Sequence, residues 1–315
     1  LPNALKPVSK AVNGILGYGQ SNSVGAGGRP PISTTQPYSN VTFKGGPRAN
    51  SADFSEFKPL VEDEISPAPD GGSTRGETFC SGAANYAVSL AARLGADPSE
   101  RVIFASTAGQ GGTAIAGLKK GTSWYNNHLI AHIEGLVALE PDSAIHLVPW
   151  LQGESDALAE TDYATYYAEL AALQADIEDD VQSRTGQTSP VFFGVVQFSS
   201  YITDWYDVHL AMLDLCEKND RFVFVTPTYH LPFTPETVTQ HLTNVGHKWI
   251  GAYIGRVYHY LVELGVKPPY LKPVSATRRG NVIRLRFKVP TRPLRLDLVN
   301  LAPTEDCGLR VEDEG

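Results

Sequence analysis

The sequence predicts an α/β protein, a three-layer α/β/α sandwich built on a parallel five-stranded sheet and followed by a small C-terminal β appendage. Three observations predict this class. Short apolar runs alternate with segments of helical periodicity over the first 266 residues, which is the pattern of consecutive βαβ units. Of the 315 residues, 42% are apolar, which is enough to bury a large core. Beyond Lys267 the pattern changes to the simple alternation of half-exposed strands.

The expected strands are apolar runs that end in polar or glycine-rich loops. The clearest helix follows Thr161 and Asp162, which are suitable caps, and its apolar side chains recur every three or four residues from Tyr163 to Val181. Further helices are expected at 83–94 and 245–264, each followed by a glycine that favours helix termination. The five strands are residues 13–18, 101–107, 144–150, 191–197 and 221–226.

Two segments depart from the alternation of strand and helix. Residues 24–78 are rich in Gly, Pro, Ser and Thr, so we expect a long loop region that carries function and serves as a lid. After Lys267, residues 281–287 and 294–301 alternate apolar and polar side chains as half-exposed strands do. We therefore assign residues 1–266 to the main domain and 267–315 to the appendage. Fewer than fifty residues make a thin β domain, which leaves open a natural chain that continues past residue 315.

Composition excludes several classes of protein. A formal net charge of −8 disfavours a nucleic-acid or anionic-membrane partner, because those partners need a basic patch. No apolar stretch is long enough to span a membrane, and the start of this chain shows no signal peptide. The three cysteines Cys80, Cys216 and Cys307 form neither a CxxC pair nor a zinc-ligand spacing, so we expect free, buried thiols and no metal or cofactor. A carbohydrate or other neutral substrate fits this balance better.

The first candidate for chemistry is Ser21. It lies in the segment Gly17-Tyr18-Gly19-Gln20-Ser21-Asn22-Ser23, directly after the apolar residues Ile15 and Leu16. A serine hydroxyl becomes a useful nucleophile only when a base takes its proton, so this position is informative if a histidine and an acid can reach it. Taken alone, the segment is equally compatible with a polar turn.

Two further loops follow apolar strands and would meet Ser21 at the carboxyl edge of a parallel sheet. The loop at 107–113 contains Gly111 and Gly112, whose backbone N–H groups can point at an oxyanion, and no Walker lysine follows in register. The loop at 150–156 contains Gln152, which can donate an amide N–H to an oxyanion, and the acids Glu154 and Asp156. A helix-capping loop would have a similar composition.

The best candidate for the base is His241. It lies in a loop just before the last long helix, where a side chain can reach over the sheet edge, whereas His247 and His259 fall inside that helix. His230 is the main rival because it follows the last strand. We expect the other histidines to lie on the surface or in the core.

Together these motifs resemble the SGNH (GDSL-like) hydrolase superfamily, and specifically its branch of sialate O-acetylesterases and acetylxylan esterases. The resemblance covers residues 13–262 in the expected order and spacing. It implies a flavodoxin-like fold and the hydrolysis of O-acetyl esters on carbohydrate. It also implies that Ser21 is the nucleophile and His241 the base, with an oxyanion hole formed by the N–H groups of Ser21 and Gly112, rather than Gly111, together with Gln152. The motifs are Gly19-Gln20-Ser21-Asn22, Gly111-Gly112-Thr113, Gln152-Gly153-Glu154-Ser155-Asp156 and His241-Leu242-Thr243.

One position departs from the superfamily pattern. Most members have an aspartate three residues before the histidine, and here that position is Val238, which cannot orient an imidazole. In some esterases of the branch that this chain resembles, the triad acid comes from the Gln-Gly-Glu motif. The resemblance therefore makes Glu154 the first candidate for the acid and Asp156 the reserve. Glu236 is nearer in sequence, and a Ser-His dyad without an acid stays possible. Under this hypothesis Glu154 accepts the His241 Nδ1–H and stabilises the imidazolium.

The implied reaction is acyl transfer through an acetyl-enzyme, with an O-acetylated carbohydrate as the partner molecule. Trp150 and Trp124 are candidates for stacking on sugar faces, as are Tyr125 and Tyr201. Two alternatives remain open at this level. One is a lipase or thioesterase of the same superfamily, and the other is a catalytically silent carbohydrate-binding protein. We expect an extracellular setting, as a secreted bacterial or phage tail-associated protein, and the sequence predicts no oligomeric state.

Overall fold

The computed structural model describes residues 5–6, 10–49, 53–70, 72, 74–201, 205–237, 240–297 and 299. The chain divides into two compact units, Leu1–Pro268 and Pro269–Gly315. Within the described residues, no helix is both long and apolar enough to cross a membrane.

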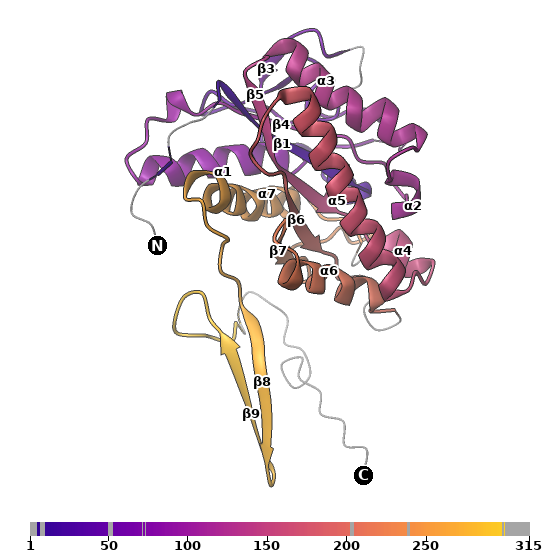
Figure 1. Cartoon of the computed structure of the whole chain (residues 1–315), viewed down its shortest axis with the longest axis vertical. Helices are drawn as coiled ribbons and strands as arrows, with labels where there is room; N and C mark the ends of the chain where they lie inside the picture. Colours follow the sequence, from indigo (N-terminus) through magenta and orange to yellow (C-terminus); the bar gives the residue numbers. More distant parts are fainter. Residues whose placement is uncertain are drawn as a thin grey trace. The chain divides into compact units, whose positions relative to one another are not determined.

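Unit one is built on a seven-stranded sheet with the strand order β3-β2-β4-β1-β5-β6-β7 (Figure 1). All neighbouring strands are parallel except β2 and β3. The strands are β1 (Val12–Gly19), β2 (Val41–Phe43), β3 (Phe57–Pro59), β4 (Ile103–Thr107), β5 (Ser143–Leu151), β6 (Phe192–Gln197) and β7 (Phe222–Pro227).

The sandwich class is confirmed, and the strand count is corrected from five to seven. The two extra strands, β2 and β3, have three residues each and lie inside the segment that we expected to be a loop region. Three residues are too few to display a period of two, so composition dominated the prediction.

Buried carboxylates order the same segment. Glu77 accepts hydrogen bonds from the backbone N–H groups of Ile32 (2.7 Å) and Ser33 (2.9 Å), and Glu62 accepts from the N–H groups of Thr78 and Ser81 (both 3.1 Å).

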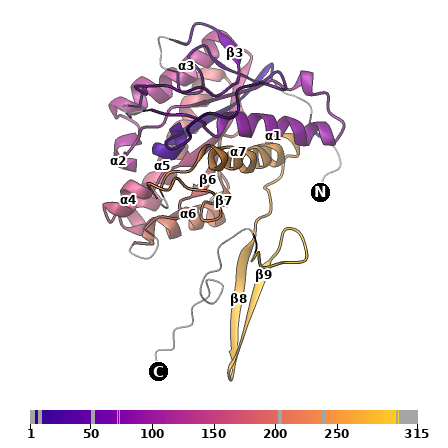
Figure 2. The ribbon, with the colours of Figure 1, turned by 180° about the vertical axis from the view of Figure 1, so that it is seen from behind.

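Helices cover both faces of the sheet. Figures 1 and 2 show α1 and α7 together on one face, with α3 and α5 on the other. Local signals delimit these helices: the Asp162 side chain accepts from the Thr165 N–H at the start of α5, and the Thr243 side chain accepts from the Gly246 N–H at the start of α7. The helices are α1 (Cys80–Arg93), α2 (Ile115–Leu118), α3 (Ile130–Leu139), α4 (Glu154–Leu158), α5 (Tyr163–Thr185), α6 (Asp207–Lys218) and α7 (Asn244–Tyr258).

Shorter helical turns adjoin the long helices. A π-helical turn precedes α3, and the expected single helix at 245–264 is α7 followed by a second π-helical turn. Among the described residues the 3₁₀ turns are η1 (Ser21–Val24) and η3 (Pro98–Glu100), and the π-helical turns are η4 (Tyr125–Leu129) and η5 (His259–Glu263).

Two apolar clusters form the core, one on each face of the sheet. One packs Ile15 and Leu147 against α1 and α7, and the other packs Leu16 and Val148 against α3, α5 and α6. Adjacent residues of β1 and β5 therefore serve opposite faces, as strands covered on both sides require.

Strand β1 marks the topological switch point of the sheet. The chain leaves β1 to form β4 on one side and then crosses to β5 on the other. In open parallel sheets the ligand crevice lies at the carboxyl ends of the strands that flank such a reversal. Ser21 follows β1 and Glu154 follows β5, so the topology places both at this crevice.

Unit two contains the antiparallel hairpin of β8 (Lys272–Arg279) and β9 (Val282–Lys288). Strand β9 matches the alternating run at 281–287, whereas β8 was not predicted. Of the second run expected to be a strand, residues 294–297 form no strand, and 298, 300 and 301 lie outside the described residues.

Helices α1 and α7 approach closely where glycines meet. A Cβ added at Gly251 would lie 2.5 Å from the Phe79 carbonyl oxygen and 2.8 Å from the Cα of Gly82. Both are backbone atoms, so the contact can be relieved only by moving one helix. Gly251 therefore sets the distance between the two helices.

We predict that Gly251→Ala lowers the free energy of unfolding by about 1–3 kcal/mol, the usual cost of overpacking, although alanine is the better helix former. Lys248→Ala, at an exposed site of the same helix, should change it by less than about 0.5 kcal/mol. Urea denaturation of both variants measures the difference. Equal stability of the two variants would show that the helices separate without cost.

Candidate active site

Ser21 and His241 come together at the carboxyl edge of the sheet. Ser21 begins the turn η1 directly after β1, and its Oγ lies 3.1 Å from His241 Nε2. Both side chains line a cavity of about 350 Å³. The structure thus joins two residues that are 220 positions apart in the sequence.

Hydrogen bonds to the His241 backbone fix the loop that carries this residue. The His241 N–H donates to Thr237 Oγ1 (3.0 Å), and the His241 carbonyl accepts from the Thr234 N–H (2.8 Å). The rival histidine, His230, lies 3.1 Å from the Tyr253 hydroxyl and does not line the cavity.

Burial lowers the pKa of His241, and the positive charge of Arg75 lowers it further. The imidazole is therefore neutral at neutral pH. A neutral imidazole can accept the proton of the Ser21 hydroxyl, which is the protonation state that a general base needs.

Asn22 connects the three loops of the site. Its Nδ2 donates to Glu154 Oε1 (3.2 Å) and to the Gln240 carbonyl (2.7 Å), and its Oδ1 accepts from the Leu242 N–H (3.3 Å). One amide side chain thus joins the turn after β1, the loop after β5 and both neighbours of His241. Sequence reasoning quoted Asn22 within its motif and assigned it no role, because its partners are remote in sequence.

Glu154 is buried beside this network. Burial raises its pKa to about 7, and the hydrogen bond from Asn22 opposes that rise. Its Oε2 has no hydrogen-bond partner among the described residues. The expected bond from His241 Nδ1 to Glu154 is not formed here: Glu154 accepts from Asn22 instead, and the side-chain partner of His241 among the described residues is Ser21. Glu236 is exposed, and Val238 lies outside the described residues.

Gln152 and Asp156 belong to a second buried network. Gln152 Nε2 donates to Asp156 Oδ2 and to the Thr113 carbonyl (3.2 Å), and Gln152 Oε1 accepts from the Tyr166 hydroxyl (2.8 Å). Asp156 also accepts from the Ile115 N–H (2.8 Å). Both donors of the Gln152 amide are thus occupied, and neither residue lines the cavity. The expected oxyanion role of Gln152 and the reserve role of Asp156 would both require this network to open.

The backbone N–H groups of Gly112 and Ser21 are candidate oxyanion donors at the cavity. The Gly112 N–H has no acceptor among the described residues, whereas the Gly111 N–H donates to Asp70 Oδ2 (3.3 Å). Gly112 has a φ of 65°, which favours glycine, and a Cβ there would meet nothing within 4 Å. Ser21 is the first residue of its turn, so its N–H has no intrahelical partner.

Three further residues line the cavity: Asp70 and Arg75, which sequence reasoning missed, and Tyr201, which it named as a candidate for sugar stacking. Arg75 Nη2 pairs with Asp70 Oδ2 at 2.8 Å; the Asp70 side chain is buried and that of Arg75 is partly buried. Tyr201 lines the cavity and its hydroxyl contacts Gln240 Nε2. Asp70 and Arg75 lie in the glycine-rich loop region, where no periodic signal marked them.

The other aromatic candidates lie elsewhere. Trp150 and Tyr125 are completely buried in the core, so neither has a face open to a sugar. Trp124 donates to the Ala108 carbonyl (2.8 Å) and stacks on His128, outside the lining of the cavity. Cys80 and Cys216 are free and buried, as expected, and Cys307 lies outside the described residues.

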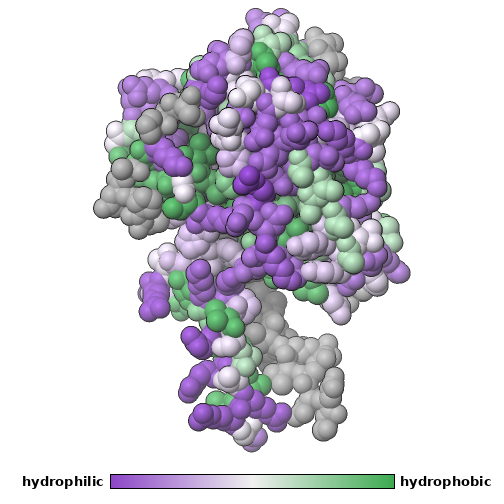
Figure 3. All heavy atoms as spheres, in the orientation of Figure 1, coloured by the Kyte–Doolittle hydropathy of each residue, from purple (hydrophilic) through white to green (hydrophobic). Residues whose placement is uncertain are grey.

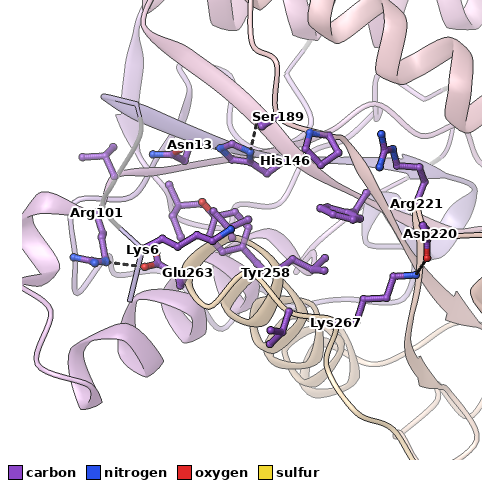
Figure 4. A pocket seen from close by; sticks show the side chains of 18 residues that line it. Lys6, Asn13, Arg101, His146, Ser189, Asp220, Arg221, Tyr258, Glu263 and Lys267 are labelled. Atoms are coloured by element: carbon purple, nitrogen blue, oxygen red, sulfur yellow. Dashed lines mark hydrogen bonds and ion pairs between the residues drawn. The ribbon is translucent and has the colours of Figure 1, made fainter. Parts of the chain in front are cut away.

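A larger cavity of about 520 Å³ lies at the amino ends of the central strands (Figure 4). It contains a second serine–histidine pair, in which Ser189 Oγ is 3.5 Å from His146 Nδ1 and His146 Nε2 is 2.9 Å from Asn13 Oδ1. Ser189 also accepts from Gln187 Nε2 (3.1 Å). The serine–histidine distance in this pair is longer than that between Ser21 and His241. The pair lies at the amino ends of the strands, opposite the carboxyl edge where the switch-point crevice opens.

Metal sites require clustered ligands. Across the part of the chain that the structure describes, no group of three or more His, Cys, Asp or Glu side chains is placed to hold a metal ion.

Comparison with known proteins defines the class of this chain. Residues 14–259 match the family described as carbohydrate esterase, sialic acid-specific acetylesterase. The protein is therefore a carbohydrate esterase, a class of hydrolase that acts on acetyl esters. The chain belongs to this acetylesterase family, as the resemblance of its motifs had indicated. A comparison with curated proteins gave no significant match.

Solved structures share the fold. A protein from Arabidopsis thaliana aligns with a TM-score of 0.61 at 21% identity, over 79% of this chain and 98% of that one. NanS aligns with a TM-score of 0.53 at 15% identity, over 78% and 96%. A carbohydrate acetylesterase from Xanthomonas citri aligns with a TM-score of 0.54 at 17% identity, over 88% and 63%.

The raised pKa of Glu154 predicts a pH-dependent stability. Between its ordinary value of 4.5 and about 7, the folded protein keeps the proton that the unfolded chain releases, so this group stabilises the fold less as the pH rises. The free energy of unfolding of wild type relative to Glu154→Gln should fall over that window, by an amount on the order of 3 kcal/mol, and then stay level. Urea denaturation at several pH values measures the difference. Parallel pH profiles would show that Glu154 is not desolvated.

Proposed function

We propose that the protein removes acetyl groups from an O-acetylated sugar or polysaccharide through an acetyl-enzyme on Ser21. The observation that carries the proposal is the 3.1 Å contact between Ser21 Oγ and His241 Nε2, inside a cavity at the switch point of the sheet. Membership of the carbohydrate esterase family supports the ester and the sugar, and the geometry supports the choice of nucleophile.

The chemistry follows from these positions. His241 Nε2 takes the Ser21 proton while Oγ attacks the acetyl carbonyl carbon, and the carbonyl oxygen becomes an oxyanion. The N–H groups of Ser21 and Gly112 stabilise that charge. The imidazolium then gives its proton to the departing sugar oxygen. Water, deprotonated by His241, attacks the acetyl-enzyme in the same way and releases acetate.

Glu154 acts through Asn22 in this proposal. Its hydrogen bond to Asn22 Nδ2 holds the amide that bonds Gln240 and Leu242 on either side of His241. Glu154 and Asn22 are then positioning residues for the base. A Ser-His dyad performs the proton transfer, and the acid keeps the loop in register.

We predict that Ser21→Ala lowers kcat/KM for 4-nitrophenyl acetate by at least about 10³-fold, because no other group in the cavity replaces the nucleophile. Ser189→Ala is the matched control, since it removes the hydroxyl of the other serine–histidine pair, and it should leave the rate within about twofold. Acetate release from a panel of acetylated polysaccharides, measured on the same proteins, tests the sugar.

Three outcomes would contradict the proposal. A normal rate in Ser21→Ala with a loss in Ser189→Ala would move the chemistry to the other cavity. No acetate release from any substrate by folded wild type would favour a binding protein. Rates that rise with acyl-chain length on nitrophenyl esters would favour a lipase or thioesterase, although the charged lining of Asp70, Arg75 and Glu154 favours a short acyl group.

The role of Glu154 is tested by its conservative variant. We predict that Glu154→Gln keeps kcat within about tenfold, because a glutamine oxygen still accepts from Asn22, while Asn22→Ala loses about 10²-fold as the His241 loop shifts. A loss in Glu154→Gln that approaches the roughly 10⁴-fold effect of removing a triad acid would instead show that its charge acts directly on His241. Steady-state kinetics of both variants separates the two roles.

A further inference from the structure

The β8–β9 hairpin has two chemically different faces. Cross-strand partners share a face, and alternate residues along each strand do the same. One face carries Ile283, Leu285 and Phe287 of β9. The opposite face, called here the basic face, carries the side chains of Lys272, Ser275, Thr277, Arg279, Val282, Arg284, Arg286 and Lys288.

The charge of the hairpin is opposite to that of the whole chain. Residues 272–288 contain six lysines and arginines and no aspartate or glutamate, whereas the whole chain has a formal net charge of −8. Five of the six cations lie on the basic face. Figure 3 shows hydrophilic side chains along the hairpin, interspersed with apolar ones.

The three cations that β9 contributes to the basic face are regularly spaced and exposed. Arg284, Arg286 and Lys288 recur every second residue of β9, which places successive charges about 7 Å apart. Lys288 stands directly opposite Lys272 on β8. Like charges in this arrangement destabilise an antiparallel pair, and an isolated two-stranded hairpin is marginal already. The row of Arg284, Arg286 and Lys288 is the part of the basic face that an anionic partner would meet.

We propose that the basic face of the β8–β9 hairpin binds an acidic polysaccharide, as a docking surface separate from the esterase cavity. Charge complementarity is the first argument, because a row of cations at regular spacing suits a polymer with regularly spaced carboxylates. The second argument concerns the alternative polyanion. Single-stranded nucleic acid is held by several aromatic side chains on which successive bases stack. The strand residues of the basic face include no aromatic side chain: Phe287 lies on the opposite face, and the ring of Tyr270, which precedes β8, lies 5.6 Å from Lys272 Nζ. Membership of a carbohydrate esterase family favours the sugar polymer.

The experiment measures binding of the full-length protein to polygalacturonate, to neutral dextran and to a single-stranded DNA oligonucleotide. Each is measured at about 50 mM and at about 200 mM salt. The test variant is the double substitution Arg284→Glu and Arg286→Glu. The control is the double substitution Arg93→Glu and Lys248→Glu, which makes the same change in net charge at exposed sites of α1 and α7.

We expect wild type and control to bind polygalacturonate, the test variant to bind it at least tenfold more weakly, and the higher salt to weaken binding. Dextran should bind no protein. Equal weakening in both double variants would overturn the proposal, because net charge alone would explain it. Tighter binding of DNA than of polygalacturonate would also overturn it in favour of a nucleic-acid partner. The binding readout does not use the esterase reaction, so failure of the proposed function leaves this result unchanged.

Discussion

The complete burial of β1 between β4 and β5 is the constraint on which the rest of unit one depends. Every residue of β1 is buried, and the strand pairs in parallel with neighbours on both sides. Helical layers must then cover both faces of the sheet. Because β1 comes first in the chain and lies inside the sheet, later strands are added on one side of it and then on the other. The reversal opens the edge of the sheet where β1 and β5 end, which is where Ser21 and Glu154 lie.

Buried polar groups give that edge its order. Asn22 joins three loops at the site, while Gln152 and Asp156 tie the loop after β5 to the start of α2. Buried polar groups are costly unless they are hydrogen-bonded, so such networks hold one arrangement and resist others. Glu154 Oε2 and Asp70 Oδ1 lack hydrogen-bond partners among the described residues. Burial of Glu154 raises the pKa of its carboxyl.

Much of the main unit was predictable because its signals are local. The five long strands and the three long helices followed from periodicity and capping residues. The position of His241, rather than His230, beside Ser21 followed from its place in the loop before the last helix. The short strands β2 and β3 were missed, since three residues carry no period. The burial of Trp150 and the position of Trp124 outside the cavity lining were missed as well, because an aromatic residue has the same sequence signal in a core and at a sugar-binding surface.

The sequence by itself determined the α/β class and the motif order that resembles an acetylesterase family, and it singled out Ser21 and His241 as candidates. Only the tertiary structure decided which groups they touch. Glu154 accepts a hydrogen bond from Asn22 rather than from His241, and the Gln152 amide donates to Asp156. Arg75 lines the cavity although it lies in a segment without periodicity. Periodicity reports which face of an element is buried, whereas a hydrogen bond between remote loops depends on backbone directions that only the folded chain sets.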